Sequence, residues 1–368
     1  MNPAQPPEIF INGRFLSQAL TGVQRYATEL VKALDELIVA GSLPAPLNGA
    51  RFTLLLPPNA ATELPLAAIR QRRVGRMKGH AWDQIDLARA ARGGILVSLA
   101  NSGPALHRRH LIVLHDAQVY RHPEFFSRSY LLLHRTLGRL YARMAQLGTV
   151  SYFSRRELAA ALSVPEDRLS VIPNSAEHLR SIVPDGSIIG KLGLAPKRFF
   201  LAVGSMNRNK NIAVAIEAAK LLARPDYPLV VVGGGNQQVF GGGQGSGDGA
   251  IWAGRLSDAE IAALYQNATA FVFPSLYEGF GLPPLEAMTF GCPVLASTAE
   301  ALMEVCAEAA CYFDPRDAAA LARLMQERID GVPPLDLLEA KQSQRLAHYS
   351  WRASAEALTR AVSALAGR

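Results

Sequence analysis

Glu278 and Glu286 flank a short stretch whose composition suits a ligand-binding turn. The seven residues between them include Gly279, Gly281 and the pair Pro283–Pro284. The glycines would let a ligand approach the backbone without obstruction, and the prolines suit the first positions of a helix, whose N–H groups lack helical partners. Because a carboxylate can accept hydrogen bonds from two neighbouring hydroxyls, the two acids could hold a ribose and a transferred hexose. The alternative for Glu286 is a first-turn acid stabilised by the helix dipole.

This turn is expected at the carboxyl end of a strand. The apolar run Ala270–Phe273 precedes it, and Gly291 and Pro293 should end the following helix within about two turns. A helix N-terminus in that position offers free amide groups and the positive end of the helix dipole. Open α/β sheets bind phosphate groups at such places. The segment therefore predicts a site for a ligand that carries both phosphate and sugar.

Short apolar runs alternate with amphipathic helices along the chain, which is typical of parallel α/β layers. Helices are expected at Gln24–Ile38 and Ser127–Leu147, and a third after Ser154, where Ser154 and Glu157 would form a capping box. In the first half of the chain, strands are expected at Ile9–Ile11, Phe52–Leu56, Ile95–Val97, Leu111–Leu114, Thr149–Ser151 and Leu169–Ile172. In the second half, they are expected at Phe199–Val203, Leu229–Val232, Ala270–Phe273 and Pro293–Ala296.

These elements predict two domains joined by a turn-rich linker between Pro184 and Pro196. The first domain would cover residues 1–184 and the second 198–347. A C-terminal helix over 348–368, around Trp351, would cross back to the first domain. The glycine-rich segment Gly233–Gly249 lacks the G-x-G-x-x-G spacing of a dinucleotide loop, so a flexible surface connection is the preferred interpretation.

Composition narrows the class of protein. The chain has 368 residues, with 49% hydrophobic and 19% charged residues, which indicates a folded chain of about two domains. No apolar run approaches the ~18 residues that cross a bilayer, and the N-terminus does not resemble a signal peptide, so we expect a cytoplasmic protein. Cys292, Cys306 and Cys311 are odd in number and lack C-x-x-C spacing, which favours buried reduced thiols over disulfides or a zinc site.

Positive charge is concentrated in the first half. Residues 1–184 carry 22 Lys/Arg against 13 Asp/Glu, whereas residues 185–368 carry 16 against 18. The first half is therefore expected to meet an anionic partner, either a membrane surface or a phosphorylated substrate. No nucleic-acid-binding motif is present. Two groups of basic side chains each have two interpretations. Each could be an ordinary solvated face, or it could contact an anionic ligand such as lipid headgroups or a lipid-linked diphosphate. The two groups are Arg128, Arg135, Arg139 and Arg143 on one helix face, and Arg70, Arg72, Arg73, Arg76 and Lys78.

Taken together, the motifs resemble those of family 4 retaining glycosyltransferases of GT-B fold. The central match is the E-x7-E segment from Glu278 to Glu286, continuing to Met288. Ile11–Arg14 and Thr21–Tyr26 resemble the family's glycine loop, and His115-Asp116 ends a strand as the family's active-site histidine does. Further matches are Ser151–Ser154, Glu157-Leu158, Pro173-Asn174, Val203-Gly204 and Lys210-Asn211.

The resemblance implies two Rossmann-like domains that face a central cleft, with the acceptor bound by the first domain and the nucleotide-sugar donor by the second, and it assigns roles to residues. His115 and Glu278 would be catalytic, with His115 positioning the sugar and stabilising charge. Lys210 would neutralise the donor diphosphate. Donor binding would involve Gly22, Gly204, Ser205, Lys210, Glu278, Gly279, Phe280, Gly281, Leu282 and Glu286, with Arg208, Asn174 and Asp116 as further candidates.

Three departures from the family pattern are present. The family often has Arg-Lys-Asn where this chain has Asn209–Asn211, so Arg208 is displaced from its usual place, and it often has a basic residue or threonine at Ser205. Its usual Pro-Glu-Val is Met303–Val305 here, and we interpret Glu304 as structural.

The implied reaction is transfer of a hexose from a nucleoside diphosphate sugar to a glycan or lipid-linked glycan, with retention at the anomeric carbon. The opening Thr21–Tyr26 resembles bacterial enzymes of O-antigen and exopolysaccharide assembly, which favours mannose and a GDP-sugar. No Asp-x-Asp motif is present, so we expect no metal and no other cofactor. The enzyme could lie peripherally on the inner face of the membrane. Alternatives are a UDP-sugar-dependent transferase, a GT-B nucleotide-sugar epimerase, and a non-catalytic nucleotide-sugar-binding partner.

Overall fold

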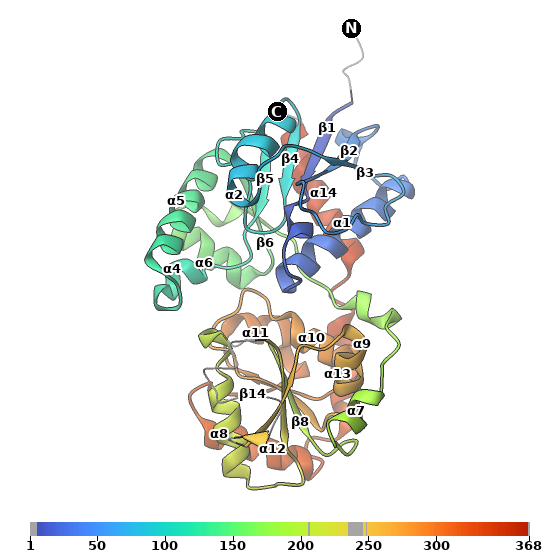
Figure 1. Cartoon of the computed structure of the whole chain (residues 1–368), viewed down its shortest axis with the longest axis vertical. Helices are drawn as coiled ribbons and strands as arrows, with labels where there is room; N and C mark the ends of the chain where they lie inside the picture. The colour runs from blue at the N-terminus through green and yellow to red at the C-terminus, as the bar shows by residue number, and fades with distance from the viewer. Residues whose placement is uncertain (1–5, 205–206, 235–245, 248, 367–368) are drawn as a thin grey trace. The chain divides into compact units, whose positions relative to one another are not determined.

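The structure is a computed structural model that describes residues 6–204, 207–234, 246–247 and 249–366. It divides into two compact units (Figure 1). Unit 1 comprises Met1–Asn174 with Ser350–Arg368, and unit 2 comprises Ser175–Tyr349. The chain thus leaves unit 1 at Asn174 rather than at the predicted residue 184, and it returns at Ser350.

Unit 1 is built on a seven-stranded parallel sheet with the order β3-β2-β1-β4-β5-β6-β7. Its central strands are buried almost throughout, as expected for a sheet covered by helices on both faces. The strands are β1 (Glu8–Asn12), β2 (Arg51–Leu56), β3 (Arg70–Arg73), β4 (Ile95–Ser98), β5 (His110–Val113), β6 (Gln146–Thr149) and β7 (Leu169–Val171).

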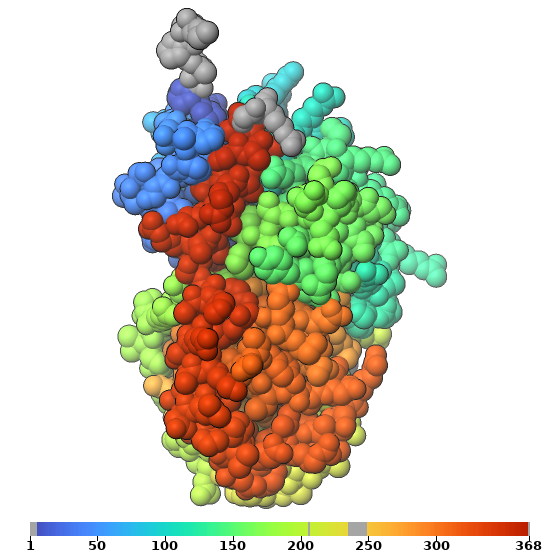
Figure 2. Space-filling model, turned by 180° about the vertical axis from the view of Figure 1, so that it is seen from behind, coloured from blue at the N-terminus to red at the C-terminus, as the bar shows by residue number. Residues whose placement is uncertain are grey.

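The long helices of unit 1 include one from the far end of the chain. They are α1 (Gly22–Val39), α5 (Arg128–Met144), α6 (Tyr152–Leu162) and α14 (Trp351–Ala366), with the short α2 (Gly79–Ala81), α3 (Ala88–Ala90) and α4 (Gln118–Arg121). Figure 2 shows α14 in red beside the blue N-terminal segments. The ring of Trp351 lies 6.0 Å from that of Tyr26 on α1, and Ser354 Oγ donates to the carbonyl of Pro173 at 2.7 Å. The predicted return of the C-terminal helix to the first domain is confirmed.

Unit 2 repeats the architecture. Its sheet has the order β10-β11-β9-β8-β12-β13-β14, and all pairs are parallel except β10 with β11. The strands are β8 (Phe200–Val203), β9 (Leu229–Val232), β10 (Ser246–Gly247), β11 (Ala250–Gly254), β12 (Ala270–Phe273), β13 (Val294–Ser297) and β14 (Cys311–Phe313). The helices are α7 (Ser187–Lys191), α8 (Ile212–Leu222), α9 (Asp258–Asn267), α10 (Leu282–Thr289), α11 (Glu300–Cys306), α12 (Ala318–Ile329) and α13 (Leu335–Leu346).

Both sheets have the strand order of doubly wound Rossmann folds. In unit 1, β2 and β3 lie to one side of the first strand, β1, and β4 lies to its other side. In unit 2, β9, β10 and β11 lie to one side of the first strand, β8, and β12 lies to its other side. The order therefore reverses between β1 and β4 in unit 1, and between β8 and β12 in unit 2. Ligands of such sheets bind outside the carboxyl ends of the strands at this reversal, called the switch point. The fold predicts one ligand-binding edge in each unit.

Most sequence-predicted strands are confirmed to within one residue at each end, but the segment after α5 is not. The helix predicted over 127–147 ends at Met144, and Ala145 is extended with φ −116° and ψ 160°. The strand predicted over 149–151 is instead β6, Gln146–Thr149. Leu147 looked helical by its spacing, but it is fully buried between the neighbouring strands.

The predicted capping box at Ser154 is wrong. Helix α6 begins at Tyr152, and its N-cap is Ser151, whose Oγ accepts from the Ser154 amide at 2.9 Å. Ser154 is buried, and its hydroxyl donates to the backbone carbonyl of His115 at 3.0 Å. The Glu157 carboxylate pairs with Arg121 instead of returning to the cap. An earlier serine therefore satisfies the helix end, and the box residues serve other contacts.

Four strands, β3, β10, β11 and β14, were not predicted from the sequence. Strand β3 is a charged edge strand, and its Arg73 donates to the Ala60 carbonyl at 3.0 Å. Charged residues on an edge strand discourage pairing with another chain, which gives this basic set a structural role. Strands β10 and β14 are only two and three residues long, and the five-residue β11 directly follows the glycine-rich segment.

The remaining predictions for this part of the chain have mixed outcomes. The predicted linker contains α7 and is tied to unit 2, because the Asp185 amide donates to the Ala259 carbonyl at 2.9 Å. Most of the glycine-rich segment, residues 235–245 and 248, lies outside the described residues. The three cysteines are free thiols, two buried and Cys311 half-buried. None of the helices in the described ranges has the length and apolar character needed to cross a membrane.

Candidate functional site

Lys210 and Glu278 meet at the switch point of unit 2. Lys210 follows β8 and Glu278 follows β12, the two strands between which the strand order reverses. Lys210 Nζ lies 2.6 Å from Glu278 Oε1, and both side chains are largely shielded from solvent, with 18% and 13% exposure. The Lys210 ammonium also lies 5.0 Å from the centre of the Phe273 ring. Two residues predicted for the donor site are thus brought into direct contact.

The loops that carry this pair are tied to each other through backbone and amide groups. The Leu276 amide donates to the Asn209 carbonyl at 2.7 Å. Asn211 has a left-handed backbone with φ 52°. Its side-chain nitrogen Nδ2 donates to the carbonyls of Pro274 and Pro315 at 3.2 and 2.7 Å. Asparagine tolerates this conformation better than most residues. The Lys-Asn motif therefore supplies one residue for charge and one that fixes the loop.

A close approach of two backbone segments forms the floor beside Lys210. Gly233, after β9, has φ +150°, and a Cβ built on it would lie 1.8 Å from the Gly204 carbonyl oxygen. Gly204 itself follows β8, and a Cβ there would meet the Lys210 side chain at 3.7 Å. Gly233 therefore has to be glycine, and Gly204 lies against the lysine stem. Ser205, the next predicted donor residue, lies outside the described residues.

Helix α10 begins at Leu282, directly after the loop that carries Glu278. Gly281 precedes it with φ +94°, and a Cβ there would lie 2.3 Å from Leu302 Cδ2. Phe280 and Leu282 are buried, and the Phe280 ring packs edge-on against Tyr349 with centroids 5.3 Å apart. Phe280 and Leu282 were both predicted to bind the donor. Their side chains belong to the core, so only their backbone groups can face a ligand.

Glu286 does not lie in the first turn of α10 as predicted. It is the fifth residue of the helix, because α10 begins before the two prolines rather than at them. The Tyr265 hydroxyl donates to Glu286 Oε2 at 3.4 Å. Burial raises the pKa of Tyr265 well above its usual value, so the hydroxyl keeps its proton for this bond. Glu286 therefore lies beyond the first turn, where an acid would be stabilised by the helix dipole, so that alternative interpretation is not supported.

Two arginines near this edge differ in their contacts. Arg208 is exposed and lies in the same short 3-10 turn as Lys210. Arg255, which the sequence analysis missed, follows β11 and is exposed, and its Nε lies 2.5 Å from a Cβ built on Gly234. Its position after a strand of unit 2 could have drawn attention to it, but β11 itself was not predicted. Arg255 and Lys210 both follow strands at the carboxyl edge of this sheet.

In unit 1, His115 lies just beyond β5 and is buried. Its Nε2 lies 2.9 Å from the Leu99 carbonyl, and because a carbonyl only accepts, Nε2 carries the hydrogen. The ring meets Tyr26 edge-on with centroids 4.8 Å apart. Burial lowers the pKa of His115 to about 4, so the ring is neutral at pH 7. It can position a ligand through Nδ1, but it offers no positive charge there, which weakens the expected charge-stabilising role.

The other unit 1 candidates lie on separate loops. Gly22 is the exposed first residue of α1, and a Cβ built on it has no neighbour within 4 Å among the described residues. Asp116 Oδ1 accepts from the amide of Gln118, the first residue of α4, at 2.8 Å. Asn174 is buried at the end of unit 1. The predicted site residues therefore form one group in each unit.

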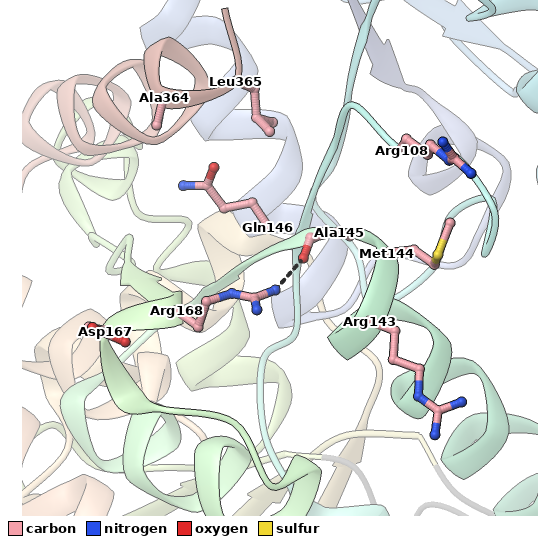
Figure 3. A pocket seen from close by; sticks show the side chains of 9 residues that line it. All are labelled: Arg108, Arg143, Met144, Ala145, Gln146, Asp167, Arg168, Ala364 and Leu365. Atoms are coloured by element: carbon pink, nitrogen blue, oxygen red, sulfur yellow. Dashed lines mark hydrogen bonds between the residues drawn. The ribbon is translucent and has the colours of Figure 1, made fainter. Parts of the chain in front are cut away.

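One cavity in the described part of the chain belongs to neither group. It lies in unit 1 near the starts of β5, β6 and β7, at the edge opposite His115 (Figure 3). Its Arg168 donates to the carbonyls of Ala142 and Ala145 at 3.3 Å, which caps the last turn of α5. Arg168 thus serves helix termination. Within the described ranges, no three His, Cys, Asp or Glu side chains cluster as metal ligands.

Comparison with known proteins bears on both units. The family described as Glycosyltransferase Family 4 matches residues 20–178, and the family described as Glycosyl transferases group 1 matches residues 187–338. The chain is 28% identical to O-antigen chain mannosyltransferase B of Escherichia coli, over 90% of this chain and 93% of that protein. It is 27% identical to O-antigen chain mannosyltransferase RfbU of Salmonella typhimurium, over 84% and 87%.

Solved structures share the fold. A sucrose-phosphate synthase from Thermosynechococcus elongatus superimposes with a TM-score of 0.68 at 19% identity, covering 96% of this chain and 98% of that one. WaaG, a glycosyltransferase involved in lipopolysaccharide biosynthesis, gives 0.64 at 15% identity, covering 96% and 98%. Anabaena HepE in complex with UDP gives 0.65 at 15% identity, covering 97% and 100%. The chain therefore belongs to the glycosyltransferases of GT-B fold, with a Family 4 domain followed by a group 1 domain.

Proposed function

We propose that this glycosyltransferase moves a hexose from a nucleoside diphosphate sugar to a glycan or lipid-linked glycan, with retention at the anomeric carbon and without a metal. The observation that supports this most is the contact of Lys210 with Glu278 at the switch point of unit 2. A cation and a sugar-binding carboxylate lie side by side there, as a donor with both diphosphate and sugar requires. Their mutual pairing keeps both side chains ordered before the donor binds.

The chemistry follows from the charges that the unit can supply. The bond from the anomeric carbon to the diphosphate oxygen breaks, and a bond from that carbon to an acceptor oxygen forms on the same face. The acceptor proton passes to an oxygen of the departing phosphate, so no protein base is required. Lys210 and backbone amides at the starts of α1 and α10 would neutralise the leaving group. Glu278 would bind hydroxyls of the transferred sugar.

His115 would act as a positioning group in this reaction. Its Nε2 hydrogen is committed to Leu99, so Nδ1 is left as an acceptor for a sugar hydroxyl. A neutral ring is suited to this because an imidazolium would carry a hydrogen on both nitrogens. The proposed metal independence rests on Lys210 and the helix-start amides together.

The sugar and nucleotide are proposed from the relatives. Two relatives are O-antigen mannosyltransferases, which favours mannose as the sugar and a GDP-sugar as the donor. The rival is a UDP-sugar, since HepE is described in complex with UDP and with UDP-glucose. A nucleotide-sugar epimerase would change the donor without an acceptor, and a binding partner would turn nothing over. Both are separable by product analysis.

We propose that the enzyme acts at an anionic membrane surface, on the inner face of the membrane. Helix α5 carries exposed Arg128, Arg139 and Arg143, with Leu132 72% exposed on the same side. Arg135 is excluded from this surface, because its Nε donates to the Val119 carbonyl at 2.9 Å. Basic residues beside an apolar side chain suit anionic headgroups. Flotation with anionic and neutral vesicles would test this contact.

Product analysis tests the reaction itself. The enzyme is incubated with GDP-mannose or UDP-glucose and a panel of mannosyl acceptors, and the anomeric protons of the product are recorded by NMR. Transfer with the donor's own anomeric configuration supports the proposal. Inverted product, or a changed donor sugar without any acceptor product, contradicts it. Activity that disappears with EDTA and returns with a divalent ion would contradict metal independence.

A further inference from the structure

The switch point of unit 1 holds a buried polar cluster that the proposed reaction has not used. Asn12 ends β1 and Ser98 ends β4, Asp83 and Ser102 are hydrogen-bonded to Asn12, and all four residues are buried. Asn12 Nδ2 donates to Asp83 Oδ1 at 3.3 Å and to the Ser102 carbonyl at 3.0 Å. Ser102 Oγ donates to Asp83 Oδ2 at 2.5 Å. The cluster thus fixes the Asp83 carboxylate at the edge where doubly wound sheets bind ligands.

Arg14 is held in place by that carboxylate. Its Nε lies 3.0 Å from Asp83 Oδ2, and its side chain is only 10% exposed. Among the described residues, no acceptor is hydrogen-bonded to either terminal nitrogen of Arg14, and neither nitrogen is sealed from solvent. The structure therefore presents a guanidinium fixed at one side with donors open at the other.

His80 lies beside the same cluster and has a defined tautomer. Its Nδ1 is 3.3 Å from Ser102 Oγ. Because the Ser102 hydroxyl hydrogen points to Asp83, Nδ1 must carry the hydrogen of that contact. In the neutral ring, Nε2 is then an acceptor. His80 is followed by the π-helical turn Trp82–Leu87, a kind of distortion that recurs at functional sites.

Helix α5 adds a column of stacked rings next to His80. Tyr130 stacks on Phe126 at 5.1 Å and on His134 at 4.0 Å between centroids, and His134 meets His80 edge-on at 5.7 Å. The spacing of four residues places these rings on one side of the helix. Within the described part of the chain, neither the Tyr130 hydroxyl nor the His134 ring nitrogens have a hydrogen-bond partner. The ring faces are covered, so the polar edges are what a ligand meets.

The charges of this surface balance. The Arg14 guanidinium is opposed by the Asp83 carboxylate, although burial raises the pKa of Asp83. Burial lowers the pKa of both His80 and His134, and nearby positive charge lowers them further, which favours neutral rings at pH 7. A phosphate would find no net positive charge here. A ligand with many neutral hydroxyls would find donors and acceptors arranged along one surface.

We propose that Arg14, His80, Tyr130 and His134, here called the acceptor wall, bind a neutral saccharide, the glycan acceptor of the reaction. This rests on the proposed glycosyl transfer for its role, but the binding itself does not. The buried polar groups behind these four side chains are satisfied internally, through the hydrogen bonds of Asn12, Ser102 and Asp83. Arg14 is fixed by its ion pair with Asp83, and His80 by its contact with Ser102. Tyr130 and His134 are fixed by ring stacking. The remaining polar atoms of Arg14, His80, Tyr130 and His134 stay available to a ligand. The wall lies entirely within unit 1.

Two variants remove hydrogen-bonding atoms while keeping the rings. Tyr130→Phe deletes the hydroxyl, and His134→Phe deletes both nitrogens but preserves an aromatic ring in the stack. Leu132→Ala, on the solvent side of the same helix, is the matched control. Mannotriose, maltotriose, chitotriose and pyrophosphate are titrated by saturation-transfer NMR against the full-length wild type and each variant. Far-UV and near-UV circular dichroism check that each variant is folded.

We expect at least one trisaccharide to bind the wild type. Its affinity should fall about tenfold in the double variant that combines Tyr130→Phe with His134→Phe, and it should be unchanged in Leu132→Ala. No saturation transfer to any trisaccharide, or equal affinity of the folded double variant, overturns the proposal. Pyrophosphate that competes with the saccharide and is lost in the double variant also overturns it, because the wall would then be an anion site. GDP and UDP binding is measured on the same samples. Saccharide binding without nucleotide binding would contradict the proposed reaction and leave the wall standing.

Discussion

Lys210 Nζ and Glu278 Oε1 lie 2.6 Å apart, so the cation that we propose for the donor diphosphate is already paired with the carboxylate that we propose for its sugar. A nucleoside diphosphate must therefore compete with Glu278 for the lysine. A complete donor can satisfy both partners at once, with phosphate oxygens for Lys210 and sugar hydroxyls for Glu278. This relationship makes the two halves of the donor interdependent in binding.

Glu278→Gln should separate those two effects. The amide keeps the shape but releases Lys210, so GDP or UDP without sugar should bind about three- to tenfold more tightly. Transfer should fall by about 10²–10³, because a charged acceptor for the sugar hydroxyls is lost. Calorimetry and a transfer assay measure the two effects, with Glu217→Gln on the exposed side of α8 as control. A parallel fall in nucleotide affinity would contradict the competition.

Gly22 and Gly233 should respond to alanine in different ways. Gly233→Ala places a Cβ 1.8 Å from the Gly204 carbonyl oxygen, so the two strands must part and the melting temperature should fall. Gly22→Ala has open space, so stability should change by about 0.5 kcal/mol or less, while donor affinity falls if the diphosphate approaches there. Thermal unfolding with and without GDP compares them. Full donor affinity in folded Gly22→Ala would remove that glycine from the site.

His115 predicts a dependence of stability on pH. Its pKa of about 4 in the folded chain is below the unfolded value, so the unfolded state binds more protons between the two values. The contribution is full above the unfolded pKa and is lost as pH falls toward 4. Urea unfolding of the wild type should therefore lose about 2 kcal/mol more than His115→Gln between pH 7 and pH 5. Equal losses in the two proteins would show that the ring is not buried as described.

Trp351 should be essential to unit 1 despite its place near the end of the sequence. It is buried 6.0 Å from Tyr26, at the start of the helix that packs on α1. Trp351→Ala should lower the free energy of unfolding by about 3–5 kcal/mol, as large truncations in a core do. The exposed Arg352→Ala on the same helix is the control, with a change expected within about 0.5 kcal/mol. Denaturant titration measures both, and similar values would contradict the packing.

The sequence was most informative where hydrophobic periodicity and glycine placement act locally. Runs such as Leu229–Val232 have no stable place except a buried strand, and this one was predicted with its exact bounds. The loop from Glu278 to Gly281 was identified because its glycines and prolines restrict the backbone. Lys210 was chosen by resemblance, and only the sheet order explains why it meets Glu278, since that order depends on long-range strand pairing.

Other features could not be read from local sequence. Strand β3 is made of charged residues because it lies at an edge, which no apolar pattern reveals. The true N-cap of α6 was obscured because Ser151 and Ser154 are both good caps, and the tertiary contact to the His115 carbonyl decides between them. The contact of Arg14 with Asp83 joins residues far apart in sequence through the sheet edge, so Asp83 was not selected beforehand and Arg14 was named only within the Ile11–Arg14 match.

Donor binding by Lys210 is the most direct test of the account. Calorimetric titration of GDP-mannose and UDP-glucose is performed on the wild type, on Lys210→Met, and on Lys220→Met at an exposed position of α8. We predict that one nucleotide sugar binds the wild type and Lys220→Met equally, and that Lys210→Met loses about 10²-fold in affinity, as expected for a charge-assisted contact to phosphate. Equal affinity of all three proteins, or no binding of either donor to the wild type, would contradict the central claim.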